Sequence, residues 1–223
     1  MNLYQRLLTE TNAEREYLLS APIITRCFEG DITVSDYVAF LTQAFHHVKH
    51  TVPLLMSVGA KLPENKEWLR EAVAEYIEEE LGHQEWILND IEHCGVDKEA
   101  VRESAPAFAT DLMVAYAYDM VNRVNPLGFF GMVHVLEGTS IAMADNAAKN
   151  IQQTLNLPTK AFSYLSSHGS LDIEHVKFFE SLMAKITDEQ EQDLIVDCAK
   201  KFFKLYADIF RTLDVSPAKA CTA

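Results

Sequence analysis

The sequence predicts an all-α protein. Apolar residues recur at three- and four-residue spacing over long stretches from one end of the chain to the other, and short polar breaks separate these stretches. Runs in which apolar and polar residues alternate, as in a half-buried β-strand, are hard to find. The composition is 48% hydrophobic and 23% charged, with only 8 Gly and 7 Pro, which is typical of a soluble globular protein.

The apolar spacing predicts seven helices, at residues 2–20, 35–60, 66–94, 106–122, 126–156, 160–185 and 188–212. Ser35 is the expected N-cap of the second helix, and Pro53, which has no backbone N–H, should kink or interrupt it. Gly95 is a stop signal for the third helix.

The later helices carry start signals of their own. Asn125 followed by Pro126 marks the beginning of the fifth helix, because proline fits the first helical position without losing a hydrogen bond. Thr187 and Gln190 have the spacing of a capping box at the start of the last helix.

We expect one domain over residues 1–213, followed by a tail, DVSPAKACTA, at residues 214–223. A helical chain of 223 residues can bury one substantial core. No internal repeat and no linker rich in Gly, Ser or Pro divides it further.

Charge and hydropathy narrow the possible partners. A formal net charge of −14 repels nucleic acid and anionic lipid, so a small molecule is the expected partner. No apolar run reaches the roughly 18 to 20 residues of a membrane span, and the first residues, MNLYQRLLTETNAEREYLL, lack the apolar block of a signal peptide. The four cysteines are scattered and are predicted to be reduced, so the expected location is the cytoplasm.

Three of the predicted helices carry ionisable side chains on stripes that are otherwise apolar. The stripe of the third helix is Leu69, Val73, Tyr76, Glu80, His83, Ile87 and Ile91. That of the sixth is Leu165, His168, Asp172, His175, Phe179, Leu182 and Ile186, and that of the fifth includes Phe130, His134, Glu137 and Ile141. Because burying an isolated charge is costly, such groups are expected to be paired, neutralised or bound to metal.

Six of these side chains could act together as metal ligands: Glu80, His83, Glu137, His168, Asp172 and His175. Side chains three or four residues apart are neighbours on a helix, so Glu80 and His83 can reach one ion, as can Asp172 and His175. Carboxylates and imidazoles from facing helices are the ligands of di-iron bundles. A set without thiolate favours iron, or manganese, over calcium, magnesium or structural zinc.

Each part of the set also has a plainer interpretation. With 33 acidic residues and 8 His in the chain, one Glu-x-x-His spacing arises by chance, and the acidic run 78–80 could be a solvated face. The His-x-x-x-Asp-x-x-His pattern could form a buried hydrogen-bond network, and Glu137 could be a core carboxylate with polar neighbours. The combination of three helices favours the metal site.

In their order, and with roughly fifty and then thirty residues between the groups, these six residues resemble the ligand set of the haem-oxygenase-like di-iron oxidases and oxygenases. The resemblance covers almost the whole chain and implies a single seven-helix bundle of that family. It also implies that the six residues bind two iron ions, and that reduced iron activates dioxygen against a small organic substrate. Known members oxidise or fragment aliphatic amino acids and fatty acids, hydroxylate nitrogen, or make para-aminobenzoate.

Further residues are expected around the metal. Members of the family differ over the carboxylate that precedes the first His, so Glu79 is the alternative to Glu80. Tyr76, one turn from Glu80, is either an outer-shell phenol or an ordinary core aromatic. His134, one turn from Glu137, could orient that carboxylate, as outer-shell groups often do.

Three histidines of the second predicted helix, His46, His47 and His50, have two interpretations. They contact the substrate or the outer shell of the metal, with His47 the expected contact, or they are ordinary surface and core residues. The expected substrate pocket lies beside the metal and is lined from Phe40, Phe45, Tyr76, Phe130 and Phe179.

The same fold also hosts the metal-free thiaminase-II and pyrroloquinoline-quinone-synthase groups, so fold alone does not decide function. Thiaminases of that type carry an aspartate after the Gln of the second helix, where Ala44 follows Gln43 here, and a nucleophilic Cys in the helix at 126–156, which contains none. The alternatives are therefore a metal-free thiaminase-II-like hydrolase or binding protein for a small heterocycle, and a structural bundle without a ligand.

The favoured interpretation is a cytoplasmic non-haem di-iron oxidoreductase. It uses two iron ions, with manganese as an alternative, and dioxygen as co-substrate to oxidise or fragment an amino-acid-like or fatty-acid-like molecule. The resemblance further implies an external electron donor and a homodimer.

Overall fold

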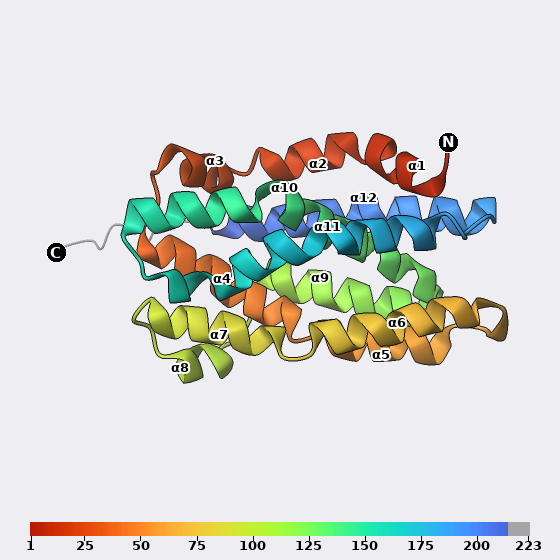
Figure 1. Ribbon diagram of the computed structural model, residues 1–223, viewed down its shortest axis with the longest axis horizontal. Helices are drawn as coiled ribbons and strands as arrows, with labels where there is room; N and C mark the ends of the chain where they lie inside the picture. The colour runs from red at the N-terminus through yellow and green to blue at the C-terminus, as the bar shows by residue number, and fades with distance from the viewer. Residues whose placement is uncertain (214–223) are drawn as a thin grey trace.

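Residues 1–213 form an all-α bundle in the computed structural model, which describes these residues apart from the side chains of 168–175 (Figure 1). No strand occurs in the described part of the chain. The α-helices are α1 (Leu3–Glu10), α2 (Asn12–Leu19), α3 (Pro22–Glu29), α4 (Val34–Val48), α5 (Thr51–Lys61), α6 (Glu67–Glu80), α7 (His83–His93), α8 (Lys98–Arg102), α9 (Phe108–Asp119), α10 (Phe129–Leu155), α11 (Ser163–Met183) and α12 (Glu189–Thr212). Between α9 and α10 the chain forms a π-helical turn at Met120–Val124 and then a 3₁₀ turn at Pro126–Gly128.

Helices α10 and α12 form the centre of the bundle. Helix α10 packs along α11 and α12, α12 also contacts α2 and α9, and α4 contacts α7 and α9. In Figure 1, α1, α2 and α3 run along one side of these central helices, and α5, α6, α7 and α8 run along the opposite side. The core is therefore built mainly from the apolar faces of the two longest helices and their neighbours.

The all-α class is confirmed, but the prediction of seven continuous helices is wrong. The predicted helix at 2–20 is α1 and α2, the one at 35–60 is α4 and α5, and the one at 66–94 is α6 and α7. Helices α3 and α8 were not expected.

Each break has a local cause. At the first, the side chain of Thr11 donates to the carbonyl of Leu7 at 2.6 Å, and its backbone leaves the helical region at φ −103° and ψ 10°. At the second, Pro53 lies in the first turn of α5, where a backbone N–H has no acceptor within the helix and its absence is tolerated. The helix is therefore interrupted before Pro53, between Val48 and Thr51. At the third, Gly82 takes φ +91°, which favours glycine.

For two helices, the N-cap is one or two residues away from the predicted one. Thr33, and not Ser35, is the N-cap of α4. The N–H of Asp36 donates to Thr33 Oγ1 at 3.2 Å, and the N–H of Thr33 donates to the Asp36 carboxylate at 2.8 Å. Asp188, and not Thr187, caps α12 by accepting from two backbone N–H groups of its first turn. Both corrections follow from the same rule, since the capping side chain must stand directly before the first helical residue.

The stretch Pro126–Leu155 is long and apolar enough to cross a membrane by length and composition. However, 56% of its most apolar window is buried inside the protein, and the central helix of a soluble domain passes the same test. Its position between α11 and α12 accounts for its apolar character.

One buried carboxylate determines where α11 begins. Asp90 on α7 is fully buried, and its Oδ1 accepts hydrogen bonds from the backbone N–H of Ser163, at 3.0 Å, and from the Ser163 hydroxyl. Its Oδ2 accepts from the N–H of Tyr164 at 2.9 Å. Asp90 therefore caps α11 from a different helix and satisfies backbone donors that a helix cannot satisfy internally.

We predict that Asp90→Ala lowers the free energy of unfolding by about 2–4 kcal/mol, because it removes a buried acceptor that binds three donors, two of them backbone N–H groups of the first turn of α11. The measurement is the urea unfolding midpoint. Asp97→Ala is the matched control: Asp97 is exposed and caps the short helix α8 through a single N–H, so the expected loss is about 1 kcal/mol or less. Equal losses in the two variants would contradict this account of Asp90.

Candidate metal centre

Glu80 and His83 meet across the break between α6 and α7. Glu80 is the last residue of α6 and His83 the first of α7, so they do not share one helix as predicted. Nevertheless, His83 Nδ1 lies 3.0 Å from Glu80 Oε2, and the imidazole is only 3% exposed. The predicted pairing of these two side chains is therefore present, although the backbone that produces it is a turn at Gly82.

Tyr76 stands on α6, one turn before Glu80, with its ring 3% exposed and in contact with the ring of Phe178. Its hydroxyl is buried and has no hydrogen-bond partner among the described residues. Burial, followed by the negative charges of Glu137 and Glu79, raises the pKa of Tyr76 far above its usual range. The phenol is therefore a protonated donor held close to carboxylates.

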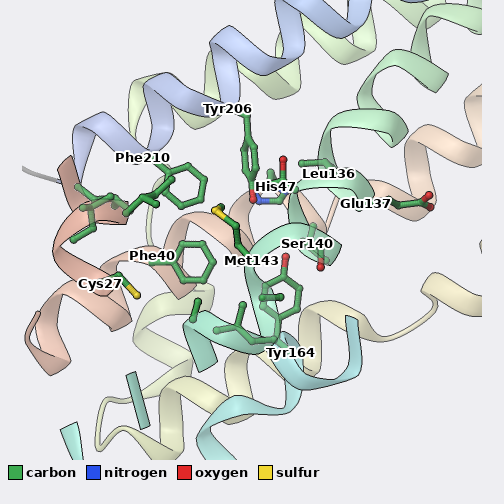
Figure 2. A pocket seen from close by; sticks show the side chains of 18 of the residues that line it. Cys27, Phe40, His47, Leu136, Glu137, Ser140, Met143, Tyr164, Tyr206 and Phe210 are labelled. Atoms are coloured by element: carbon green, nitrogen blue, oxygen red, sulfur yellow. The ribbon is translucent and has the colours of Figure 1, made fainter. Parts of the chain in front are cut away.

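Glu137 lies in the middle of α10 and lines a cavity together with Tyr76 and Glu80. In Figure 2 its carboxylate stands at one edge of this cavity, apart from Phe40 and Phe210. Glu80 from α6 and Glu137 from α10 thus line the same cavity, and His83 of α7 contacts Glu80.

The other three predicted ligands, His168, Asp172 and His175, lie outside the residues whose side chains the structure describes. They belong to α11, which packs against α10 and α7, the helices of Glu137 and His83. Among the described side chains alone, no three His, Cys, Asp or Glu residues gather as a metal site would require. The complete six-residue set stays a prediction.

The described histidines differ in their surroundings. His46 is 1% exposed and is held by Ser104 Oγ, 2.9 Å from its Nε2, and by Lys49 Nζ, 3.2 Å from its Nδ1. The Nδ1 of His50 lies 3.1 Å from the hydroxyl of Tyr118. Both histidines therefore have structural partners in the fold.

His47, in contrast, lines the cavity with Glu80 and Glu137, and its buried ring packs edge-on against Tyr206. Glu79 is exposed, whereas Glu80 is half-buried and contacts His83, which favours Glu80 of the two candidate ligands.

His134 lies in an aromatic enclosure. Its ring stacks on Phe179 with centroids 6.1 Å apart and meets Tyr4 and Phe203 edge-on. It makes no hydrogen bond to another described residue, and burial lowers its pKa to about 4. The proposed orientation of Glu137 by His134 stays a prediction.

The cavity beside Glu137 has a volume of about 180 Å³ and is mostly apolar. Residues of α10 from Phe129 to Ile151 line it, a stretch of about 33 Å at 1.5 Å per residue. Its far part lies against α3, and Figure 2 shows Phe40, Met143 and Phe210 gathered there. The space is elongated along α10; besides Glu80 and Glu137, a third carboxylate, that of Asp36, lines it near α3.

Of the predicted lining residues, Phe40 and Tyr76 line the cavity, but Phe45, Phe130 and Phe179 are buried elsewhere in the core. The spacing of apolar residues did not predict that α3 and α12 line the cavity, through residues such as Cys27 and Tyr206. These residues lie on helix faces that come together only in the folded bundle. The one available signal for α3 was Pro22 at its first position, with Gly30 after its end.

Comparisons with known proteins agree with this geometry. Residues 38–207 match the model of a family described as iron-containing redox enzymes. No curated protein matches the chain.

Among solved structures, a domain of unknown function with a haem-oxygenase-like fold from Shewanella denitrificans is 26% identical, with a TM-score of 0.81 over 95% of this chain and 90% of that one. A TenA homologue from Pseudomonas syringae is 11% identical, with a TM-score of 0.78 over 95% and 92%. Haem oxygenase from Leptospira interrogans is 17% identical, with a TM-score of 0.75 over 95% and 100%. The predicted haem-oxygenase-like fold is confirmed.

The low pKa of His134 predicts a loss of stability in acid. In the unfolded chain this imidazole takes up a proton near pH 6.5, and in the folded protein only near pH 4, so its contribution is present above pH 6.5 and is lost as the pH falls to about 4. The shift corresponds to at most about 3 kcal/mol. The free energy of unfolding should be measured from pH 7 to pH 4 for the wild type and for His134→Phe. Its slope against pH should be smaller in His134→Phe, by the amount that corresponds to the uptake of about one proton.

His93→Phe is the control, because His93 is exposed at the end of α7. A His134→Phe variant that loses stability in acid as steeply as the wild type would refute the assignment.

Proposed function

Because the chain belongs to the family of iron-containing redox enzymes, we propose that it is a non-haem di-iron oxidase or oxygenase that uses dioxygen to oxidise or fragment a small organic substrate. The observation that supports the proposal is the contact between Glu80 and His83 beside an apolar cavity that Glu80 and Glu137 both line. Such a cavity with a few convergent polar groups is the usual form of a small-molecule site.

The described donors fit an iron ion. Glu80 Oε2 and His83 Nδ1 lie 3.0 Å apart, so a carboxylate oxygen and an imidazole nitrogen are already brought together beside the cavity. Carboxylate oxygen and imidazole nitrogen are the donors that non-haem iron uses. Glu80, His83 and Glu137 would hold the metal together with the predicted ligands of α11, His168, Asp172 and His175.

Bound Fe(II) would supply the electrons with which dioxygen is activated. The chain's own residues do the remaining work. The apolar walls exclude water and hold the substrate beside the carboxylates, while Glu137 and Glu80 contribute negative charge at one end. Tyr76, which stays protonated at neutral pH and has no acceptor among the described residues, can donate its proton in a hydrogen bond to an anion that enters this end.

The form of the cavity favours a fatty-acid-like substrate over an amino-acid-like one. A free amino acid carries an ammonium and a carboxylate, and each needs a hydrogen-bonded partner when buried. The walls between Glu137 and α3 are mostly apolar, and the one carboxylate there, Asp36, is already paired with Arg26 at 3.1 Å. A fatty acid carries a single carboxylate, to which the Tyr76 hydroxyl can donate, and its long alkyl chain needs no hydrogen-bonded partner.

The remaining features of the proposal come from the family resemblance and the composition. An external donor supplies further electrons, manganese is the alternative metal, and the enzyme works as a cytoplasmic homodimer without nucleic acid or membrane partners. The strongly acidic composition supports the last point.

We predict that the wild type binds about two equivalents of Fe(II) under anaerobic conditions, and that His83→Ala and Glu137→Ala each bind about one or fewer. The measurement is iron per chain after removal of free metal. His93→Ala, which changes an exposed imidazole ten residues after His83, is the matched control and should load as the wild type does. A chain that retains no iron under any loading condition would contradict the proposal and favour the metal-free thiaminase-II-like alternative.

A second prediction concerns the substrate. In the series octanoate, decanoate and dodecanoate, each added methylene should tighten binding about fourfold, from about 0.8 kcal/mol per buried CH₂. Ala147→Leu, which narrows the apolar cavity from α10, should weaken dodecanoate binding at least about tenfold. Calorimetric titration measures both, and an affinity independent of chain length would exclude an alkyl substrate.

A further inference from the structure

A second cavity, of about 310 Å³, lies on the other side of α10. Helices α1, α2, α11 and α12 contribute its remaining walls. Among the described residues, it shares Glu137 and Thr139 with the apolar cavity described above. Its volume is within the usual range for a small-molecule site, and neither the family nor the proposed function assigns it a role.

The mouth of this second cavity combines exposed apolar side chains with positive charge. Leu8, Leu19 and Ile141 line it and are 38–40% exposed. Arg15 and Lys177 line it as well, and neither forms an ion pair with a carboxylate of the described residues. In a chain with 33 acidic and 19 basic residues, two cations without acidic partners at one opening indicate a place for an anion.

Arg15 is held in position at this mouth. One of its terminal nitrogens, Nη2, donates to the carbonyl of Leu8 at 3.1 Å and to Asn12 Oδ1 at 2.8 Å. Its Nε and Nη1 make no hydrogen bond to another described residue. A guanidinium oriented in this way presents free donors suited to a carboxylate.

The interior of the cavity supplies the remaining recognition groups. The His134 imidazole is 6% exposed, lines the cavity and has no hydrogen-bond partner among the described residues. Burial, and then the charge of Arg15, keep it neutral by lowering its pKa to about 4. A buried polar ring without a partner, surrounded by Tyr4, Phe179 and Phe203, points to a ligand that reaches it.

Gly138 lines the cavity and is exposed. It lies in the middle of α10, where glycine costs helix stability relative to alanine, and a Cβ added there would meet no atom of the described residues within 4 Å. Among the described residues, no close approach of another helix therefore explains the glycine. A larger side chain would project into the cavity that Gly138 lines.

We propose that this second cavity binds a small organic anion. Its carboxylate pairs with Arg15 and Lys177 at the mouth, and its apolar or aromatic body packs between α2 and α10 towards His134. The inner end of such a ligand meets Glu137 from the side opposite the apolar cavity, so the ligand is distinct from the substrate of the proposed oxidase.

The test uses the full-length chain, with 2-naphthoate and its neutral analogue 2-naphthamide as probes, followed by fluorescence titration. The wild type should bind one equivalent of naphthoate more tightly than the amide. Arg15→Gln should weaken naphthoate at least about tenfold and leave the amide unchanged, and Lys177→Gln should act in the same direction.

Two substitutions on α10 form a matched pair that locates the site. Gly138→Leu fills the second cavity and should abolish binding of both probes, whereas Ala147→Leu fills the apolar cavity and should leave naphthoate binding unchanged. Thermal unfolding of both variants checks that each is folded.

Naphthoate binding that survives Gly138→Leu and Arg15→Gln, or that is lost in Ala147→Leu, would overturn the proposal. Because dodecanoate binding responds to Ala147→Leu and naphthoate binding to Gly138→Leu, failure of one proposal is distinguishable from failure of the other.

Discussion

The arrangement of the candidate site depends on the buried carboxylate of Asp90. Its three hydrogen bonds fix the first turn of α11 against α7, at a point two helical turns after His83. Because an unpaired carboxylate in the interior is costly, the register between these helices cannot slip without losing all three bonds. The helix of the three predicted ligands thus starts from a fixed position relative to His83.

Helix α10 is held by a second constraint, its close contact with α12. A Cβ at Gly131 would lie 2.6 Å from the backbone nitrogen of Ala199, so the two helices approach more closely there than any larger residue permits. Helix α10 packs against α12, α11 and α3, and both cavities border parts of its surface. Glu137 lines both cavities, and among the described residues it is the one acidic side chain that does so.

The sequence predicted some of these features because they are local. Helical periodicity, the stop at Gly95 and the start at Asn125 depend on residues within a few positions of each other, and all are present. The contact between Glu80 and His83 was also predictable, since three-residue spacing brings the side chains together even though the helix breaks at Gly82. That break was missed because the apolar spacing continues through it.

Other features could not be predicted because they depend on segments that meet only in the folded protein. From the sequence alone, His46 could contact the substrate or the outer shell of the metal, but in the folded protein Ser104, fifty-eight residues away, lies against its ring. Both cavities are spaces between several helices, and periodicity places a residue on a face without saying whether that face meets another helix or a void. Phe130 and Phe40 have similar spacing patterns, yet one is fully buried and the other lines the cavity.

The break at Gly82 also bears on how iron would be held. The 3.0 Å contact between His83 Nδ1 and Glu80 Oε2 fixes the orientation of the imidazole, so this pair would present one oriented nitrogen donor and one carboxylate to an ion. Because α6 and α7 are joined here by a turn and not by a continuous helix, a shared ion would tie them together, and its binding would add to the stability of the fold.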